Sequence, residues 1–247
     1  MGIPNKDYRE DCDRAIYLRG VINQSLVDEV LPQINRLRLA SVEPITVYID
    51  SPGGSIALAE TIRRMVKAPH PDGDECRLIT AVIGIAASAA ADFLALGDYA
   101  IAYPHTQILY HGSRTDTAGV VTYESATSLD FHFGSQKRSV KRLVRLYGPL
   151  LLGDSEKAEY DNLTVNGPDK QEWLGEKIGH KIQPLWYFMV SLCRRLQSAD
   201  YDLSPEEAYW LGLVDEVPGS DLPNLRIFIE NKDRPAPQSD KVDSLPA

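Results

Sequence analysis

Ser88 is the residue whose surroundings first suggest chemistry. It stands among small residues in the stretch Gly84–Phe93 (GIAASAAADF), directly after the apolar run Leu78–Ile83. A serine hydroxyl is a useful nucleophile at neutral pH only when a neighbouring base takes its proton. Ser88 by itself is better explained as a small residue packed in an alanine-rich helix. A catalytic interpretation therefore needs a base from elsewhere in the chain.

A histidine is the usual base for a serine nucleophile. The candidates are His70, His105, His111, His132 and His180. His111 is the best candidate for the base. It follows the apolar stretch Gln107–Tyr110, which predicts a strand that ends at the same sheet edge as Ser88. His70, His105 and His180 are better interpreted as surface residues.

The glycine pair Gly53-Gly54 could supply the third element of such a site. Backbone N–H groups in a turn without side-chain cover can stabilise an oxyanion, and each such donor contributes about 3 kcal/mol in the transition state. The alternative is an ordinary tight turn; neither of the common glycine-rich phosphate-binding motifs is present. An orienting carboxylate cannot be chosen from composition alone, because the chain has 35 acidic residues.

Alternating strand and helix patterns predict how these residues are positioned. Apolar runs predict strands, and helical spacing of apolar residues predicts the helices between them. The predicted strands are Ala15–Leu18, Ile45–Ile49, Leu78–Ile83, Tyr99–Ala102 and Gln107–Tyr110, and the predicted helices are Ser25–Leu39 and Ile56–Val66. This order indicates an α/β fold with a mainly parallel sheet, whose functional groups gather at the carboxyl ends of the strands.

The rest of the chain predicts a helical insertion and a short final unit. Residues 123–197 are polar and mostly helical in pattern. Ser204 and Pro205 open a short helix with a capping box, and Leu213–Val217 reads as a strand. Residues 231–247 are polar and punctuated by prolines, which predicts a disordered tail.

Composition excludes several classes of protein. Of 247 residues, 43% are hydrophobic, which suits a globular domain, and 26 basic against 35 acidic residues give a net charge of −9. No cluster of Lys and Arg stands out, so we expect no nucleic acid or other polyanion as a partner. Cys12, Cys76 and Cys193 lie far apart, as suits reduced thiols better than a disulfide framework or a metal site. Without a membrane-spanning run or a signal peptide, the expected compartment is the cytoplasm.

Four blocks in order resemble the ClpP family of serine peptidases. They are YIDSPGG (Tyr48–Gly54), GIAAS (Gly84–Ser88), YPHTQILYHG (Tyr103–Gly112) and DYDLSPEEAYWLGLVDEV (Asp200–Val217). The resemblance implies a ClpP/crotonase-like spiral of ββα units over residues 14–230, after an N-terminal arm at residues 1–13. It also implies that the helical region at about residues 121–198 is an enlarged form of the family's handle.

Carried over position by position, the resemblance implies a catalytic triad. The nucleophile falls on Ser88, the base on His111 and the orienting carboxylate on Asp200, with Asp202 and Asp215 as nearby competitors. The oxyanion donors fall on the backbone N–H groups of Gly54 and Ala89.

The implied activity is that of a serine endopeptidase acting on polypeptides inside an oligomeric chamber. No metal or organic cofactor is implied. The family usually forms homo-oligomeric rings, heptameric and often stacked, that work with an AAA+ unfoldase. Thr46 replaces an aromatic residue that is common in the family's ATPase-docking pocket, whereas Tyr48 retains the aromatic residue that accompanies it there. Ala199 and Tyr201 stand where the family commonly has arginines that link rings.

Other functions remain open. A non-catalytic ring subunit or scaffold would keep the fold without the activity. A crotonase-type acyl-CoA enzyme would share the fold and the paired backbone donors but would not need a Ser-His-Asp triad. Relatives that use a Ser-Lys dyad are a further alternative.

Overall fold

A six-stranded sheet organises the part of the chain that is described. The structure is a computed structural model, and it describes residues 9–70, 73–111, 123–163, 173–174, 176–179, 183, 187, 191 and 200–222. The strands are β1 (Ala15–Arg19), β2 (Ile45–Ser51), β3 (Leu78–Ala87), β4 (Tyr99–Ala102), β5 (Gln107–Tyr110) and β6 (Tyr201–Leu203). Their order is β1-β2-β3-β5-β6, with β4 also paired to β3. All pairs are parallel except β5 with β6, so the predicted α/β class is confirmed.

The long strand β3 holds the sheet together. Its first part pairs with β4, from Ile79 opposite Tyr99, and its last part pairs with β5, from Ile85 opposite Gln107. The strand continues beyond the predicted end at Ile83 to Ala87, because its last residues pair with β5. As a result, the chain turns into the next helix directly at Ser88.

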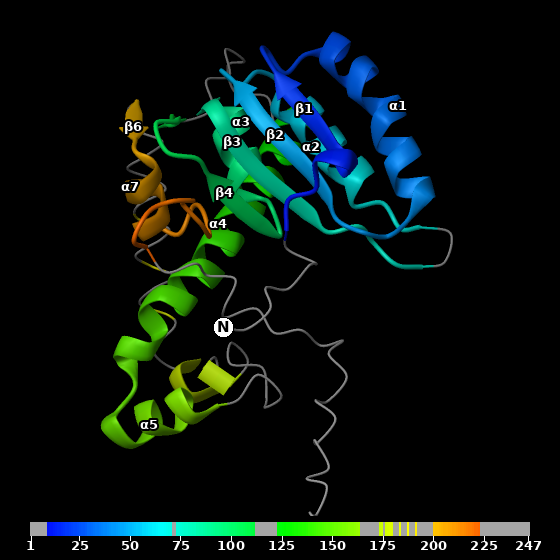
Figure 1. Cartoon of the computed structure of the whole chain (residues 1–247). Helices are drawn as coiled ribbons and strands as arrows, with labels where there is room; N and C mark the ends of the chain where they lie inside the picture. The colour runs from blue at the N-terminus through cyan, green and yellow to red at the C-terminus, as the bar shows by residue number, and fades with distance from the viewer. Residues whose placement is uncertain are drawn as a thin grey trace, which may run out of the picture.

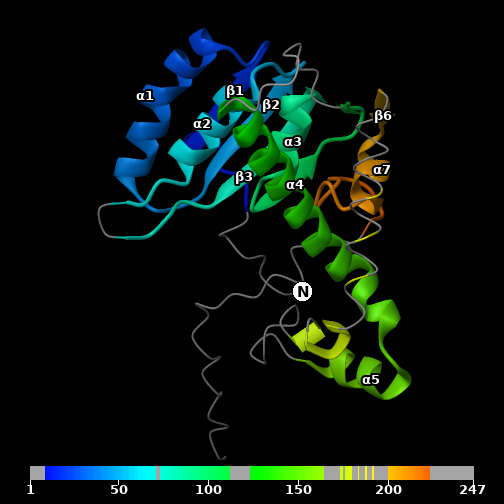
Figure 2. The same ribbon diagram turned by 180° about the vertical axis from the view of Figure 1, so that it is seen from behind.

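Three helices follow the first three strands and cover one face of the sheet, which Figure 2 shows from the helical side. They are α1 (Gln24–Ala40), α2 (Ile56–Val66) and α3 (Ala89–Ala95). Asn23 and Ser55 begin the first two by accepting hydrogen bonds from helical N–H groups, as good N-caps do. The apolar side chains between these helices and the sheet form the main core.

The other face of the sheet, toward the viewer in Figure 1, carries a smaller apolar cluster. Ile79, Ala81, Tyr99 and Ile101 are buried there, and Tyr48 and Tyr103 pack against them. Tyr48 also stacks on Tyr17, with ring centroids 5.2 Å apart.

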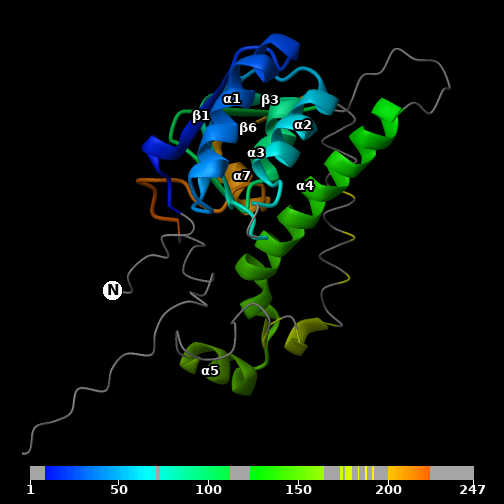
Figure 3. The same cartoon turned by 90° about the vertical axis from the view of Figure 1, so that its right-hand side faces the viewer.

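A long helix, α4 (Tyr123–Tyr147), packs on the side of α2 and α3 that faces away from the sheet and continues beyond the sheet (Figure 3). A 3-10 helix, η3 (Gly148–Leu151), and α5 (Asp154–Asn162) lie at its far end, away from the sheet in Figure 1. These elements occupy the region for which the sequence predicts a helical insertion. The predicted tail at 231–247 lies outside the described residues.

A buried ion pair holds α4 against the rest of the domain. Arg142 Nε lies 2.7 Å from a carboxylate oxygen of Asp215, and its other nitrogens donate to the carbonyl oxygens of Ala95 and Gly97 at 2.9 and 3.0 Å. Arg142 and Asp215 are 2% and 0% exposed, so both charges depend on these partners. The network joins α4 to the carboxyl end of α3.

The short final unit differs from its prediction in one element. α7 (Pro205–Trp210) begins with the predicted capping box, in which Ser204 and Glu207 bond to each other's backbone. The predicted strand Leu213–Val217 is wrong, since only an isolated bridge between Ile101 and Glu216 forms there. Asp215 instead turns inward, where its carboxylate accepts from the backbone N–H of Ala100 at 2.8 Å and holds the arginine of α4.

Candidate active site

Ser88 lies at the sharp turn between β3 and α3. Its backbone has φ 56° and ψ −127°, a conformation that residues other than glycine rarely adopt. The N–H of Ser88 donates to the carbonyl of Leu109 at 2.9 Å, which ties the turn to β5. The interpretation of Ser88 as a residue inside a packed helix is therefore wrong. A strained strand-to-helix turn of this kind is how α/β-hydrolases expose their nucleophilic serine.

The hydroxyl of Ser88 is not used to cap the helix that follows it. Serine is a favoured N-cap residue, yet its side chain makes no capping hydrogen bond at the start of α3. Ala89 is the first residue of α3, so its N–H has no acceptor within the helix. The start of α3 thus leaves a hydroxyl and a backbone donor beside each other.

The glycine turn after β2 packs directly against this start of α3. A Cβ atom built on Gly53 would lie 2.5 Å from the Ala87 carbonyl oxygen, 2.7 Å from Ser88 Cβ and 3.1 Å from the Ala89 nitrogen. Gly53 also has φ 93°, which disfavours any side chain. Only glycine can occupy this position without moving the chain around Ser88.

Gly54 directs its own N–H away from Ile22, the residue with which it forms a bridge. The N–H of Ile22 donates to the Gly53 carbonyl at 2.8 Å, and the N–H of Ser55 donates to the Ile22 carbonyl at 2.9 Å. These two bonds define a parallel bridge between Ile22 and Gly54 in which the polar groups of Gly54 face the other side. Gly54 as a residue is exposed, which is consistent with the predicted role of its N–H as an oxyanion donor.

Strand register puts His111 and Asp200 at the same edge of the sheet as the turn at Ser88. β3 pairs with β5 up to Ala87 opposite Leu109, so Ser88 and His111 both follow the paired ends of adjacent parallel strands. β5 pairs antiparallel with β6 from Ile108 opposite Leu203 to Tyr110 opposite Tyr201. Continuing that register by one residue brings His111 opposite Asp200. Residues directly opposite in an antiparallel pair present their side chains on the same face.

The two competing aspartates have other partners. Asp215 is fully buried and binds Arg142 and, at 3.1 Å, Arg145. Asp202 lies in β6 and accepts a hydrogen bond of 2.7 Å from the Gln107 side chain. Because side chains alternate along a strand, Asp202 shares a face with the position of Asp200 but lies farther from the end of β5.

A histidine that the sequence did not single out forms an ion pair with the helix that begins after Ser88. His132 Nδ1, on α4, lies 2.9 Å from an oxygen of Asp92 on α3, and both side chains are largely buried. Burial lowers the pKa of His132, but the hydrogen bond and the negative charge of Asp92 outweigh it, so the pKa is raised above its usual value. Neither residue has a local motif, so only the packing of α4 on α3 reveals the pair.

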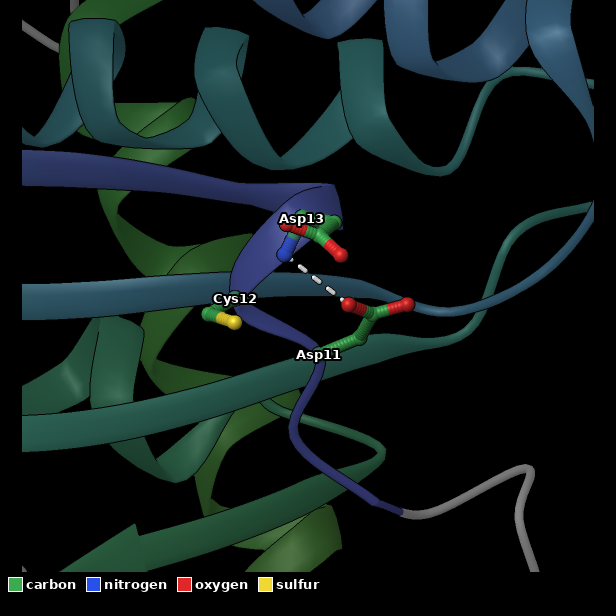
Figure 4. A group of neighbouring side chains, drawn as sticks. All are labelled: Asp11, Cys12 and Asp13. Carbon is green, nitrogen blue, oxygen red and sulfur yellow. Dashed lines mark hydrogen bonds between the residues drawn. The ribbon is translucent and has the colours of Figure 1, made fainter.

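Asp11, Cys12 and Asp13, at the short 3-10 helix η2 (Cys12–Arg14), form a group with metal-ligating atoms close together. Figure 4 shows the hydrogen bond of 2.9 Å in which the Asp13 N–H donates to the Asp11 carboxylate. Asp11 therefore caps this helix, and all three side chains are exposed. Exposed acidic groups with such a structural role give no reason to assign a metal site.

No described helix has the length and apolar character needed to cross a membrane.

The expectation that no basic cluster exists is wrong. α4 carries Lys137, Arg138, Lys141, Arg142 and Arg145 within its second half. Their spacing of three to four residues places several of them on one side of the helix. The net negative charge of the whole chain gives no indication of this local group of basic residues on α4.

A family model described as Clp protease matches residues 8–147, more than half of the chain. The chain belongs to the Clp protease family.

Individual relatives are distant. The "ATP-dependent Clp protease proteolytic subunit 3" of Rhizobium etli is 32% identical over 111 residues, which are 44% of this chain and 55% of that protein. The protein of the same name from Rhizobium meliloti is 26% identical over 164 residues, 66% of this chain and 76% of that protein. A solved structure, the ClpP protease catalytic domain from Plasmodium falciparum, has a TM-score of 0.49 and 22% identity, with 85% of this chain and 88% of that chain covered. The chain thus spans about half the length of the first of these relatives, 55%.

Proposed function

We propose that this protein is a serine endopeptidase whose triad is Ser88, His111 and Asp200. The observation that carries the proposal is the register of β3, β5 and β6. It assigns the three residues to the ends of three adjacent strands, at the edge where the strained turn and the glycine turn meet. Family membership supports the same chemistry, because the relatives are named as proteolytic subunits.

In the proposed reaction, His111 removes the proton of Ser88 as the serine oxygen attacks a peptide carbonyl. The resulting oxyanion accepts hydrogen bonds from the backbone N–H groups of Gly54 and Ala89. His111 then gives its proton to the leaving amine, and water hydrolyses the acyl-enzyme by the same route. Asp200 holds the imidazole in the useful tautomer and stabilises its cation.

The assembly and the partners follow from the same proposal. The relatives' names describe ATP-dependent proteolytic subunits, so we extend to this chain a homo-oligomeric ring, a polypeptide substrate and an AAA+ unfoldase. Thr46 bears on the docking of such an unfoldase, because it is buried and its hydroxyl accepts a 3.0 Å hydrogen bond from the backbone of Asp11. It therefore secures the N-terminal segment and offers no aromatic surface to a partner. The cytoplasmic location stays a prediction.

Hydrolysis of a fluorogenic peptide and of casein tests the proposal. The wild type should cleave the peptide, and Ser88→Ala should lose at least about 10³-fold in kcat, as expected when a triad nucleophile is removed. Ser25→Ala, an exposed serine in the first turn of α1, is the matched control and should keep full activity. Native mass measurement of each variant shows whether assembly is retained. An assembled wild type that cleaves neither substrate would favour the non-catalytic ring subunit.

A further inference from the structure

A pocket of about 500 Å³ lies between α2 and α4, away from the proposed active site. It is lined by six cationic side chains, two carboxylates and the apolar residues Leu96 and Phe131. The cations are Arg63, Arg77, Lys137, Arg138, Lys141 and Arg145. A volume of this size suits a small-molecule ligand, since such sites span about 300–1,000 Å³.

The two carboxylates that line the pocket are already compensated. Glu60 lies 2.6 Å from Arg63 and 2.7 Å from Arg64. Burial raises the pKa of Glu60, but these two arginines outweigh it and hold the pKa below its usual value. Glu60 is therefore an ionised partner for its own helix and contributes little repulsion to an anion in the pocket.

Asp98 is compensated in the same way. Its carboxylate lies 2.6 Å from Arg138 and 3.1 Å from Lys67, and it accepts a hydrogen bond of 2.8 Å from the N–H of Leu78. With both carboxylates engaged, the surplus charge of the lining is positive. In a protein with a net charge of −9, a concave surface with this charge stands out.

Two lysines supply much of that surplus. Among the described residues, neither Lys137 nor Lys141 has a carboxylate within ion-pair distance; Lys137 lies over the ring of Phe133, 5.5 Å from its centroid. Burial lowers the pKa of Lys141, and the positive charges of Arg138, Arg145 and Lys137 lower it further. These side chains repel one another, and a bound anion would relieve that repulsion.

We propose that this basic pocket binds a small ligand that carries two or more phosphate groups. Lys137, Lys141 and the arginines beside them would contact the phosphate oxygens, for which guanidinium and ammonium groups are strong donors. Phe131 and Leu96 form an apolar wall on which an organic part of the ligand can pack. A bounded pocket of this volume favours a small polyphosphate over a nucleic-acid strand, which needs an extended basic surface.

The pocket is separate from the proposed catalytic edge. Arg77 immediately precedes β3 and Asp98 immediately precedes β4, so the pocket lies at the amino ends of these strands, whereas Ser88 follows the carboxyl end of β3. β3 alone spans about 30 Å at the usual rise per residue. A ligand there would bridge α2 and α4 without touching the peptide substrate.

Binding of sodium tripolyphosphate to the full-length protein tests the proposal. Isothermal titration at constant ionic strength should show saturable binding with one site per subunit. Lys137→Gln/Lys141→Gln should weaken the affinity by at least about tenfold, because two charge-assisted contacts are lost. Arg36→Gln/Lys157→Gln removes the same charge from exposed positions on α1 and α5 and should bind as the wild type does.

Two further ligands identify what is recognised. Adenosine triphosphate that binds more tightly than tripolyphosphate would show that the apolar wall contributes, and equal affinities would show that the phosphate chain suffices; both results support the proposal. Absence of saturable binding, or equal weakening in both double variants, overturns it. Binding of a short single-stranded oligonucleotide without binding of tripolyphosphate also overturns it and assigns the surface to nucleic acid.

Discussion

The hydroxyl of Ser88 is held at the turn between β3 and α3 by a backbone conformation that few residues adopt. The turn is stabilised because the N–H of Ser88 donates to the carbonyl of Leu109. In addition, Gly53 has no side chain that would collide with Ser88. Strain of this kind, about 1–3 kcal/mol, is retained where the surrounding structure imposes it. At the residue scale, the glycine turn and the serine turn are therefore one unit.

Gly53→Ala should disrupt that unit. The added methyl group would meet the Ala87 carbonyl and Ser88 Cβ, so we expect lower peptide hydrolysis and a loss of stability of about 1–3 kcal/mol from overpacking, in addition to backbone strain. Gly73→Ala is a matched control, because Gly73 has φ 95° but nothing within 4 Å of an added Cβ. It should cost about 1–2 kcal/mol for the backbone alone and leave hydrolysis unchanged. Equal effects of the two variants on hydrolysis would argue against the packed turn.

The choice between the two aspartates around Tyr201 can be tested in the same way. Asp200→Asn should reduce kcat by about 10³–10⁴, since an amide no longer favours the required tautomer of the base. Asp202→Asn, which perturbs only a surface bond to Gln107, should stay within about twofold of the wild type. Steady-state peptide hydrolysis distinguishes them. The reverse pattern would assign the orienting role to Asp202.

At the scale of elements, α4 is attached to α3 and β4 by two buried polar contacts. Arg142 with Asp215 joins it to the carboxyl end of α3 and to β4, and His132 with Asp92 joins it to the middle of α3. Breaking a buried pair by removing one partner leaves an uncompensated charge. The position of α3 therefore depends on residues that lie far from it in the sequence.

Arg142→Met should lower the free energy of unfolding by about 3–5 kcal/mol, because Asp215 would lose one of its two cationic partners in a fully buried site. Lys177→Met removes a pair with Glu159 in which both side chains are well exposed, and should cost less than about 1 kcal/mol. Urea unfolding of both variants gives the comparison. A small effect of Arg142→Met would mean that Arg145 alone compensates Asp215.

The His132–Asp92 pair predicts a pH dependence of stability. The pKa of His132 is raised in the folded state. The stabilisation that its charged form adds to the free energy of unfolding is therefore fully present below the unfolded pKa, about 6.5, and is lost as the pH rises through the higher folded pKa. The difference in unfolding free energy between wild type and His132→Gln should therefore be largest in acid and shrink toward alkaline pH. Urea titrations from acid to alkaline pH measure it. A difference that grows with pH would contradict the predicted sign.

At the scale of the whole molecule, local patterns predict most of the sheet. The bounds of α2, β4 and β5 agree with their predictions, because apolar periodicity and turn residues decide them locally. The local sequence predicts neither the extension of β3 to Ala87 nor the absence of a strand at Leu213–Val217. Both depend on long-range contacts, the pairing of β3 with β5 and the ion pair of Asp215 with Arg142.

The candidate site follows the same division. Ser88 and His111 each follow a predicted strand, so the sequence alone predicts that they lie at one edge of the sheet. The close approach of Gly53 to Ser88, and the antiparallel pairing of β6 that brings Asp200 to this edge, are seen only in the folded structure. The basic pocket escaped sequence reasoning because net charge averages over the whole chain, whereas α4 concentrates its cations on one side.

The central claim, that Ser88 is an activated nucleophile, is tested most directly by covalent labelling with a fluorophosphonate probe and intact-mass measurement. The assembled wild type should gain the mass of one probe per subunit, with the label mapped to Ser88. Ser88→Ala and His111→Ala should remain unlabelled while keeping the same native mass. An assembled wild type that shows no mass gain, or a label mapped to another serine, would contradict the account.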